Sequence, residues 1–104
     1  MSRSKQIAVT IYEQLGGGRM RVMIGFKDGI ALENGLQFGF KGCRKANKCV
    51  VRLSALDLYD VVFYHANLRN IENPCPEVGR FESVYADKLV GVFEEFTGLR
   101  TRLF

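Results

Sequence analysis

The sequence predicts a single α+β domain in which an N-terminal and a C-terminal helix flank a sheet of four to five antiparallel strands. Its 104 residues are a usual size for one domain, and an apolar content of 47% is enough for one hydrophobic core. Helical periodicity is confined to the two ends of the chain, and strand-like alternation fills its middle. Strands and helices therefore do not interleave, which argues against a doubly wound parallel sheet and favours a meander with the C-terminal helix packed on it.

The first expected element is an N-terminal helix, for which Ser4 is a suitable N-cap. Apolar residues follow at helical spacing, namely Ile7, Ala8, Ile11, Tyr12 and Leu15. Three consecutive glycines, residues 16–18, should end this helix, because glycine adopts left-handed backbone angles at little steric cost.

The first strand is expected directly after these glycines. Met20, Val22 and Ile24 alternate there with Arg19, Arg21 and Met23, and this period of two is typical of a half-buried strand. The dipeptide Asp28-Gly29 then predicts a two-residue hairpin turn, and Asn34-Gly35 predicts a second turn.

Further strands are expected in the rest of the middle region. Leu36, Phe38 and Phe40 alternate, and the β-branched or aromatic runs at 50–53 and 59–64 are joined by a short turn at 55–57. Residues 65–80 are expected to be irregular, because Pro74 and Pro76 exclude regular strand pairing.

The C-terminal helix has the clearest pattern. Its apolar residues recur at i, i+4, i+7, i+11 and i+14, as Tyr85, Leu89, Val92, Phe96 and Leu99. Phe81, Val84 and Phe93 lie beside this stripe. Ser83 can cap the start of the helix and Gly98 its end, so residues 83–97 are expected to be helical.

Four strings of the sequence resemble one protein family: TIYEQLGGGRM, ENGLQFGF, LSALDLYDVVF and VYADKLVGVFEEFTGL. Between about residues 10 and 99 the chain is similar to a family of small proteins, without a settled function, that are encoded by bacteriophages and prophages. The resemblance implies a phage accessory protein that acts in a bacterial cell. It transfers no functional residues, and residues 42–49 and 69–80 match nothing in the family.

The sequence also predicts where the protein is found. No apolar run approaches the roughly 20 residues that a membrane span needs, and the N-terminus lacks the pattern of a signal peptide. We therefore expect a cytoplasmic protein of the host bacterium, with no membrane partner and with its three cysteines reduced.

The net charge of +4 is concentrated in one stretch. Between Glu33 and Asp57 the chain has no acid and five cations: Lys41, Arg44, Lys45, Lys48 and Arg52. This stretch therefore carries +5, and the rest of the chain sums to −1. Such a local excess of positive charge favours contact with phosphates, and the small residues Gly42 and Ala46 leave room for a nucleic-acid backbone to approach.

These cations are expected at the tip of a hairpin that Cys43 and Cys49 flank, where they would project together into solvent. Arg19 and Arg21, on the solvent side of the expected first strand, would extend the same surface. Lysine and arginine are also the ordinary way to keep a loop soluble and a sheet edge unpaired. The nucleic-acid interpretation and the solvated-loop interpretation therefore both stay open.

Cys43, Cys49, His65 and Cys75 are the one candidate set of metal ligands. Structural zinc sites normally take their ligands in close pairs, whereas 5, 15 and 9 residues separate these four. A Cys43–Cys49 disulfide across the hairpin is sterically feasible but disfavoured in a reducing cell. We therefore expect neither a metal nor a disulfide.

The sequence shows no catalytic constellation. His65 closes a strand-like run, Cys75 has no nearby cation in the sequence to activate it, and Asp57 is placed to cap a turn beside Asp60. The glycine groups fit neither a phosphate loop nor a dinucleotide fingerprint. Nucleophile, base and orienting group do not occur together, so we expect a non-enzymatic protein without a cofactor.

Two classes of function remain. The first is binding to nucleic acid or to a ribonucleoprotein, including a host defence complex that the protein would block, through the basic loop. Base stacking would need an exposed aromatic ring beside that loop, for which Tyr59 and Tyr64 are the candidates, although core packing explains both rings as well. The second class is a protein–protein interaction module, or a homodimer, that binds a host or phage protein through a sheet edge or a helix face.

Overall fold

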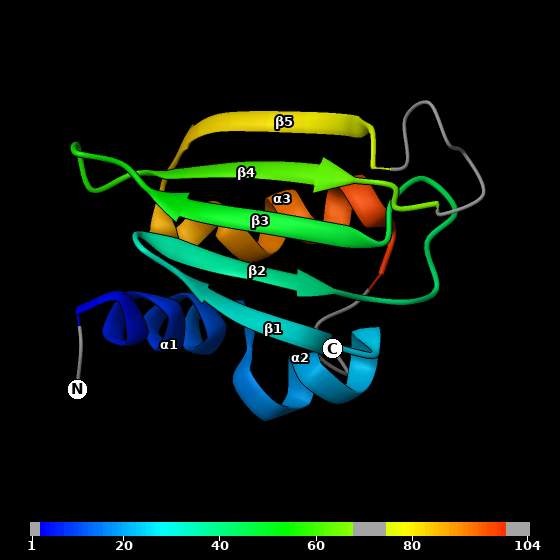
Figure 1. Cartoon of the computed structure of the whole chain (residues 1–104), viewed down its shortest axis with the longest axis horizontal. Coiled ribbons are helices and arrows are strands. Elements are labelled where there is room, and N and C mark those ends of the chain that lie inside the picture. Colours follow the sequence, from blue (N-terminus) through cyan, green and yellow to red (C-terminus); the bar gives the residue numbers. More distant parts are fainter. Residues whose placement is uncertain (1–2, 68–74, 100–104) are drawn as a thin grey trace.

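The structure, a computed structural model, describes residues 3–67 and 75–99 as a five-stranded sheet with helices on one face (Figure 1). Its elements are α1 (Arg3–Leu15), α2 (Gly17–Ile24), β1 (Lys27–Leu32), β2 (Gly35–Gly39), β3 (Lys48–Leu53), β4 (Tyr59–Tyr64), β5 (Glu77–Val84), a 3-10 turn η1 (Ala86–Lys88) and α3 (Leu89–Thr97). The predicted α+β class is confirmed.

The sheet is an antiparallel meander with the order β1-β2-β3-β4-β5, in which each strand pairs with its neighbour along the chain. Gly35 allows β2 to approach β3 closely, because a Cβ at this position would lie 2.0 Å from the carbonyl oxygen of Val51. A larger residue at position 35 would therefore displace one of these two strands.

A cluster of phenylalanines holds the helices to the sheet. Phe63 of β4 stacks on Phe96 of α3 with ring centroids 4.3 Å apart. Phe40 meets Phe93 edge to face at 5.2 Å, and Phe38 stacks on Phe26 at 5.0 Å. Helix α1 adds Ile11 and Leu15, which are buried against the same core. Offset-stacked and edge-to-face rings stabilise a fold beyond the apolar area that they bury.

The strand predicted at 19–24 is wrong, because these residues form helix α2. Met20 and Ile24 are buried, whereas Val22 between them is 81% exposed. Residues at i and i+4 fit both a strand period of two and a helix period of 3.6, and the exposure of Val22 fits only the helix. Gly16 (φ 125°) and Gly17 (φ 59°) end α1 and redirect the chain into α2.

The hairpin turn predicted at Asp28-Gly29 is also wrong, because both residues lie inside β1. Asp28 has a φ of 54° at an irregularity in the pairing of β1 with β2, between Lys27 and Ile30. The dipeptide therefore supplies the left-handed angle of a bulge. The predicted second turn lies one residue earlier than expected, at positions 33–34.

The irregular segment predicted at 65–80 is wrong in its last residues, since β5 begins at Glu77. Pro76 precedes that strand, and its carbonyl oxygen accepts the backbone N–H of His65 at 3.0 Å. Pro74 lies outside the described residues. Proline therefore marks the start of the edge strand and does not exclude the strand.

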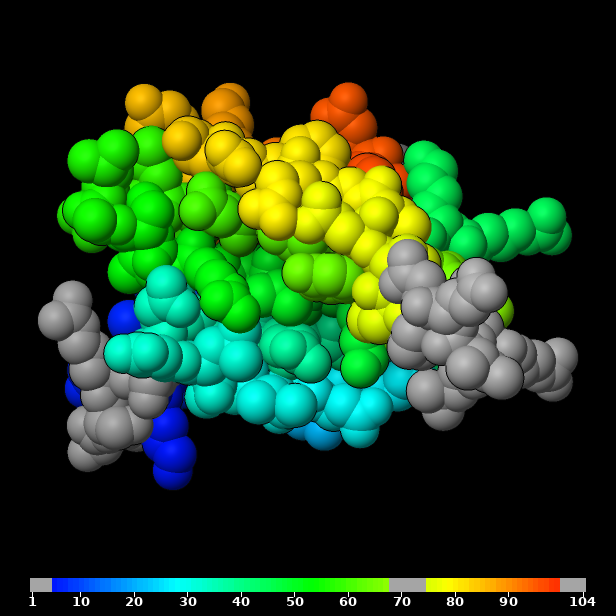
Figure 2. Space-filling model, turned by 45° about the horizontal axis from the view of Figure 1, so that its top comes forward, coloured from blue at the N-terminus to red at the C-terminus, as the bar shows by residue number. Residues whose placement is uncertain are grey.

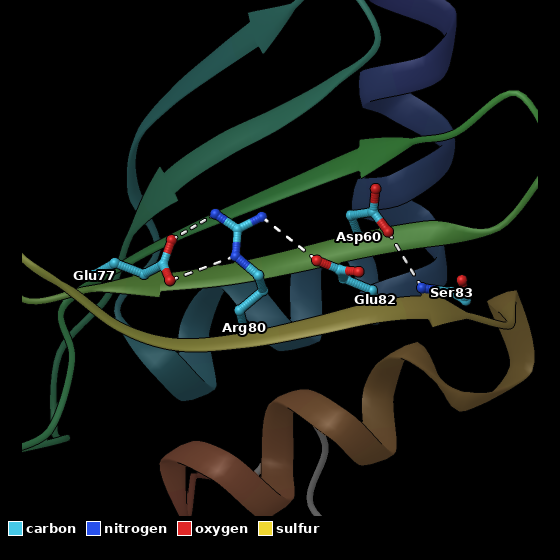
Figure 3. Close-up of polar contacts among 5 residues, drawn as sticks. All are labelled: Asp60, Glu77, Arg80, Glu82 and Ser83. Carbon is cyan, nitrogen blue, oxygen red and sulfur yellow. Dashed lines mark hydrogen bonds and ion pairs between the residues drawn. The ribbon is translucent and has the colours of Figure 1, made fainter.

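Neither serine that was expected to cap a helix does so. Helix α1 begins at Arg3, before Ser4. Ser83 lies inside β5 and has a φ of 57°. Its backbone N–H donates to Asp60 Oδ1 at 3.2 Å (Figure 3). The C-terminal helical region accordingly begins with η1 at Ala86, while its predicted end at Gly98 is confirmed by a left-handed φ of 74°.

No described helix combines the length and apolar character needed to cross a bilayer.

Replacing Phe93 by alanine is expected to lower the free energy of unfolding by about 3–5 kcal/mol, because the ring is fully buried against Phe38, Phe40 and Phe63. Tyr85→Ala is the control from the same predicted stripe. Tyr85 is 63% exposed, so its loss should change stability by less than about 0.5 kcal/mol. Denaturant titration measures both values, and equal losses would contradict this placement of α3.

Candidate functional site

The sheet has one uncovered side, which we call the open face. Its side chains come mostly from alternate positions of the strands: Lys27, Ile30, Gln37, Lys48, Val50, Arg52, Asp60, Val62, Tyr64, Glu77, Arg80 and Glu82. Figure 2 shows this side, where strand residues coloured cyan to yellow lie at the surface and helices appear only at the margins. The alternation of the strands therefore sorts side chains between the closed core and this face.

The basic loop does not project as a free hairpin tip. It runs from residue 40 to residue 47, and Asn47 anchors its end. The Asn47 backbone N–H donates to the Tyr64 carbonyl at 3.0 Å, and the Asn47 side chain exchanges two hydrogen bonds with the backbone of Ala66 at 2.7 and 2.9 Å. Ala46 is completely buried. The loop is therefore part of the packed structure.

The cations of the loop are exposed, as expected for Lys41, Arg44 and Lys45, but Lys45 also contacts α3. Lys45 Nζ donates to the carbonyl oxygen of Phe96 at 3.2 Å and lies 5.3 Å from the centroid of that ring. Lys45 thus binds the C-terminal end of α3, where a positive charge is favourable. Arg44 is exposed on the loop.

Lys41 lies at the end of α2. Its backbone N–H donates to the Ile24 carbonyl at 2.8 Å, and its side chain would lie 3.3 Å from a Cβ at Gly25. Arg19 and Arg21 are exposed on α2, on the helix-covered side of the sheet (Figure 1). The prediction that these arginines lie on a strand is therefore wrong, because α2 carries them.

Lys48 and Arg52 are the two predicted residues that the structure brings together on the open face. They lie four residues apart on β3, which corresponds to roughly 13 Å along a strand. Both line a shallow groove of about 170 Å³, together with Gln37, Val50, Tyr64 and Cys75. No acidic side chain lines this groove among the described residues. The groove therefore offers two cations and an aromatic ring to an anionic ligand.

Lys27 adds a third cation beside this groove. It pairs with Gly39, which in turn pairs with Lys48. A Cβ at Gly39 would lie 3.2 Å from Lys27 Cγ, so the Lys27 side chain lies across the glycine toward β3. The sequence did not predict Lys27 as a site residue, because only strand register brings it beside Lys48.

The β5 side of the open face carries most of its acids (Figure 3). Arg80 Nη2 lies 2.6 Å from Glu77 Oε1, and Arg80 Nη1 lies 3.8 Å from Glu82. The hydrogen bond and the charge of Glu77 raise the pKa of Arg80 above its ordinary value. Carboxylates already surround Arg80, and Asp60 lies directly opposite Arg52 on the neighbouring strand. The cations of the open face without an acid directly opposite are therefore Lys48 of β3, which faces Tyr64, and Lys27 of β1, which faces Gly39.

Of the two aromatic candidates, only Tyr64 is placed for stacking. Tyr59 is 4% exposed and belongs to the core, so the prediction of Tyr59 as a stacking platform is wrong. Tyr64 is half-buried and lines the groove directly opposite Lys48 on the neighbouring strand.

The structure does not gather the candidate metal ligands. Cys49 is buried on the core face of the sheet, whereas Cys75 is exposed beside the open-face groove. All three cysteines are free thiols. Within residues 3–67 and 75–99, no group of three or more histidine, cysteine or acidic side chains is arranged to hold a metal ion.

Comparisons of this chain with protein-family models, with curated proteins and with solved structures found no match. The resemblance to phage and prophage proteins therefore stays a prediction. Inferences about the site rest on the geometry and chemistry of its own residues.

Alkylation should separate the three thiols by burial. The thiolate is the reactive form of cysteine, and burial raises the pKa of the Cys49 thiol far above its ordinary value. We expect iodoacetamide to modify exposed Cys75 first and Cys49 only after denaturation, as measured by peptide mass spectrometry. Cys75→Ser should remove the fast phase. Rapid modification of Cys49 in the native protein would contradict the placement of β3.

Proposed function

We propose that this protein binds single-stranded nucleic acid on the open face of its sheet, either as a free strand or as a strand exposed in a ribonucleoprotein. The observation that carries the proposal is the groove in which Lys48, Arg52 and Tyr64 lie together without an acid among its described lining residues. Cationic grooves with aromatic side chains are the usual means of holding single strands.

Each groove residue has a chemical role in this proposal. The Lys48 ammonium and the Arg52 guanidinium would contact phosphates, and the arginine can do so through two hydrogen bonds. Lys27 would contact a further phosphate beside Lys48. The Tyr64 ring would stack on a base, while Val50 forms an apolar floor between the two cations of β3.

The shape of the surface favours a single strand over a duplex. Bases of a duplex are read by an element that enters a groove, whereas a single strand can lay its unstacked bases on a sheet. The open face is a shallow surface made of strands, and its aromatic ring is useful only to a base that has left a stack.

The binding surface proposed here differs from a basic hairpin tip. Lys41 and Lys45 contribute to packing at the ends of α2 and α3, and Arg44 lies on the loop between them. We propose binding without catalysis. The resemblance to phage proteins favours a target inside an infected bacterium, such as a strand held by a host defence ribonucleoprotein.

A second candidate is protein binding through the helix face of α2. Val22 is 81% exposed and Met23 is 36% exposed, with Arg19 and Arg21 beside them. Met20 and Ile24 hold the opposite side of this helix in the core. An exposed aliphatic side chain between two arginines suits an apolar pocket with an acidic rim on a protein partner.

Two double variants of equal charge test the proposed function. Lys48→Ala with Arg52→Ala should flatten the dependence of log affinity on log salt by about 1.4 units, since each single-strand phosphate contact contributes about 0.7. Arg19→Ala with Arg21→Ala removes the same charge from α2 and should leave that slope unchanged. Fluorescence anisotropy with an unstructured oligonucleotide, measured over a range of salt concentrations, gives both slopes.

Tyr64 variants isolate the stacking contribution. Tyr64→Ala should weaken binding by about 1–3 kcal/mol without changing the salt slope, and Tyr64→Phe should retain most of the affinity. An equal loss of slope in both double variants would overturn the proposal, because it would mean that charge acts without regard to its place. Binding of a protein partner that persists after nuclease treatment, and that the Val22→Glu variant abolishes, would support the α2 surface as the binding site instead.

A further inference from the structure

The central row of the open face contains one polar side chain, Gln37, that has no hydrogen-bond partner among the described residues. The strand register aligns Ile30, Gln37, Val50, Val62 and Arg80 across the sheet. Val50 and Val62 in this row are only 6% and 8% exposed, although the described helices lie on the other face of the sheet. Gln37 lies between Ile30 and Val50, and no hydrogen bond joins its side chain to another residue in the described part of the chain.

An aliphatic side chain would suit the position of Gln37 better if the row served packing alone, because its two cross-strand neighbours are aliphatic. A carboxamide instead presents one acceptor oxygen and two N–H donors in one plane. Gln37 is half-buried and lines the same groove as Lys48, Arg52 and Tyr64. Its free hydrogen-bonding groups therefore lie where a ligand of this groove would lie.

The cations are placed symmetrically about Gln37. Gln37 pairs with Val50, and Lys48 and Arg52 are each two residues from Val50 on the same face of β3. Each cation is thus roughly 7 Å along the strand from the row that holds the carboxamide. Tyr64 is a diagonal neighbour of Val50 across β3 and β4, a separation that an aromatic side chain can span.

We propose that Gln37 reads the base of the nucleotide held in this groove and selects adenine. Oε1 accepts a hydrogen bond from the adenine N6 amino group, and Nε2 donates to adenine N7. The same edge of guanine offers two acceptors, that of cytosine a donor, and that of thymine or uracil one acceptor. On this edge adenine alone matches both groups of the carboxamide, so the inference requires that the bound base turns its N6/N7 edge, and not its Watson–Crick edge, toward Gln37. This inference rests on the proposed function and adds base selectivity to it.

The test uses oligothymidylate strands that carry one central dA, dC or dG, with unsubstituted oligothymidylate as the reference. The intact chain is expected to bind the dA strand at least about fivefold more tightly than the reference, the lower end of the value for a bidentate contact to a base. Gln37→Leu replaces the carboxamide by methyl groups, which leaves a branched side chain of similar bulk without hydrogen-bonding groups. It should reduce the dA preference over the oligothymidylate reference to about onefold.

The outcomes distinguish this inference from the proposal on which it rests. Equal binding of all four strands by the intact chain, with a normal salt slope, would overturn adenine selection and leave single-strand binding intact. A preference for dC or dG, or a dA preference that survives in Gln37→Leu, would also overturn the role of Gln37. Absence of binding to every strand would overturn the proposed function and the inference together. Thermal melting of Gln37→Leu confirms that the variant is folded.

Discussion

The helices of the described chain all pack on one face of the sheet, so each strand has one side that must be apolar and one side that remains available (Figure 1). The phenylalanine cluster determines which side faces the core, because Phe38 and Phe63 pack against Phe93 and Phe96 of α3. A slip of one residue in β3 would turn Lys48 and Arg52 into the core and expose Cys49 and Val51. The packing that stabilises the fold therefore also determines where the cations of β3 lie, and the candidate site is a consequence of strand register.

Positive charge that is clustered in the sequence is distributed in space. Asn47 ties the basic loop to the end of β4, and Lys45 reaches across to the carbonyl of Phe96. In these contacts the lysine packs against α3 and its charge stabilises the C-terminal end of that helix, which is a structural role. The charge of the proposed groove belongs to residues on regular strands, where a rigid backbone holds the side chains in a fixed relation. A site on strands positions its groups more accurately than a site on a loop.

Much of the fold followed from sequence pattern, and the failures have physical causes. The alternation at 36–40 and the β-branched or aromatic runs at 50–53 and 59–64 predicted three strands correctly, because these segments are the largely buried central strands of the sheet. The sequence did not predict α2, because the spacing of Met20 and Ile24 fits both a strand and a helix over such a short segment. It did not predict β5, because glycine and charged residues interrupt the alternation of apolar and polar residues in this irregular edge strand. Lys48 and Arg52 were predicted as site residues from local charge. Lys27, Gln37 and Arg80 were not, since pairing between strands, which a single sequence does not specify, brings them to the same face.

The central proposal is that single-stranded nucleic acid binds the open face of the sheet. The basic loop and α2 are not the contact surface in this account. Backbone amide chemical shifts, recorded while a single-stranded oligonucleotide is added to the isotopically labelled protein, test it most directly. The account predicts that the largest changes occur at Gln37, between Lys48 and Arg52, and at Tyr64, with smaller changes at Lys27. Changes concentrated on residues 41–45 or on α2, with the strands unaffected, would contradict it.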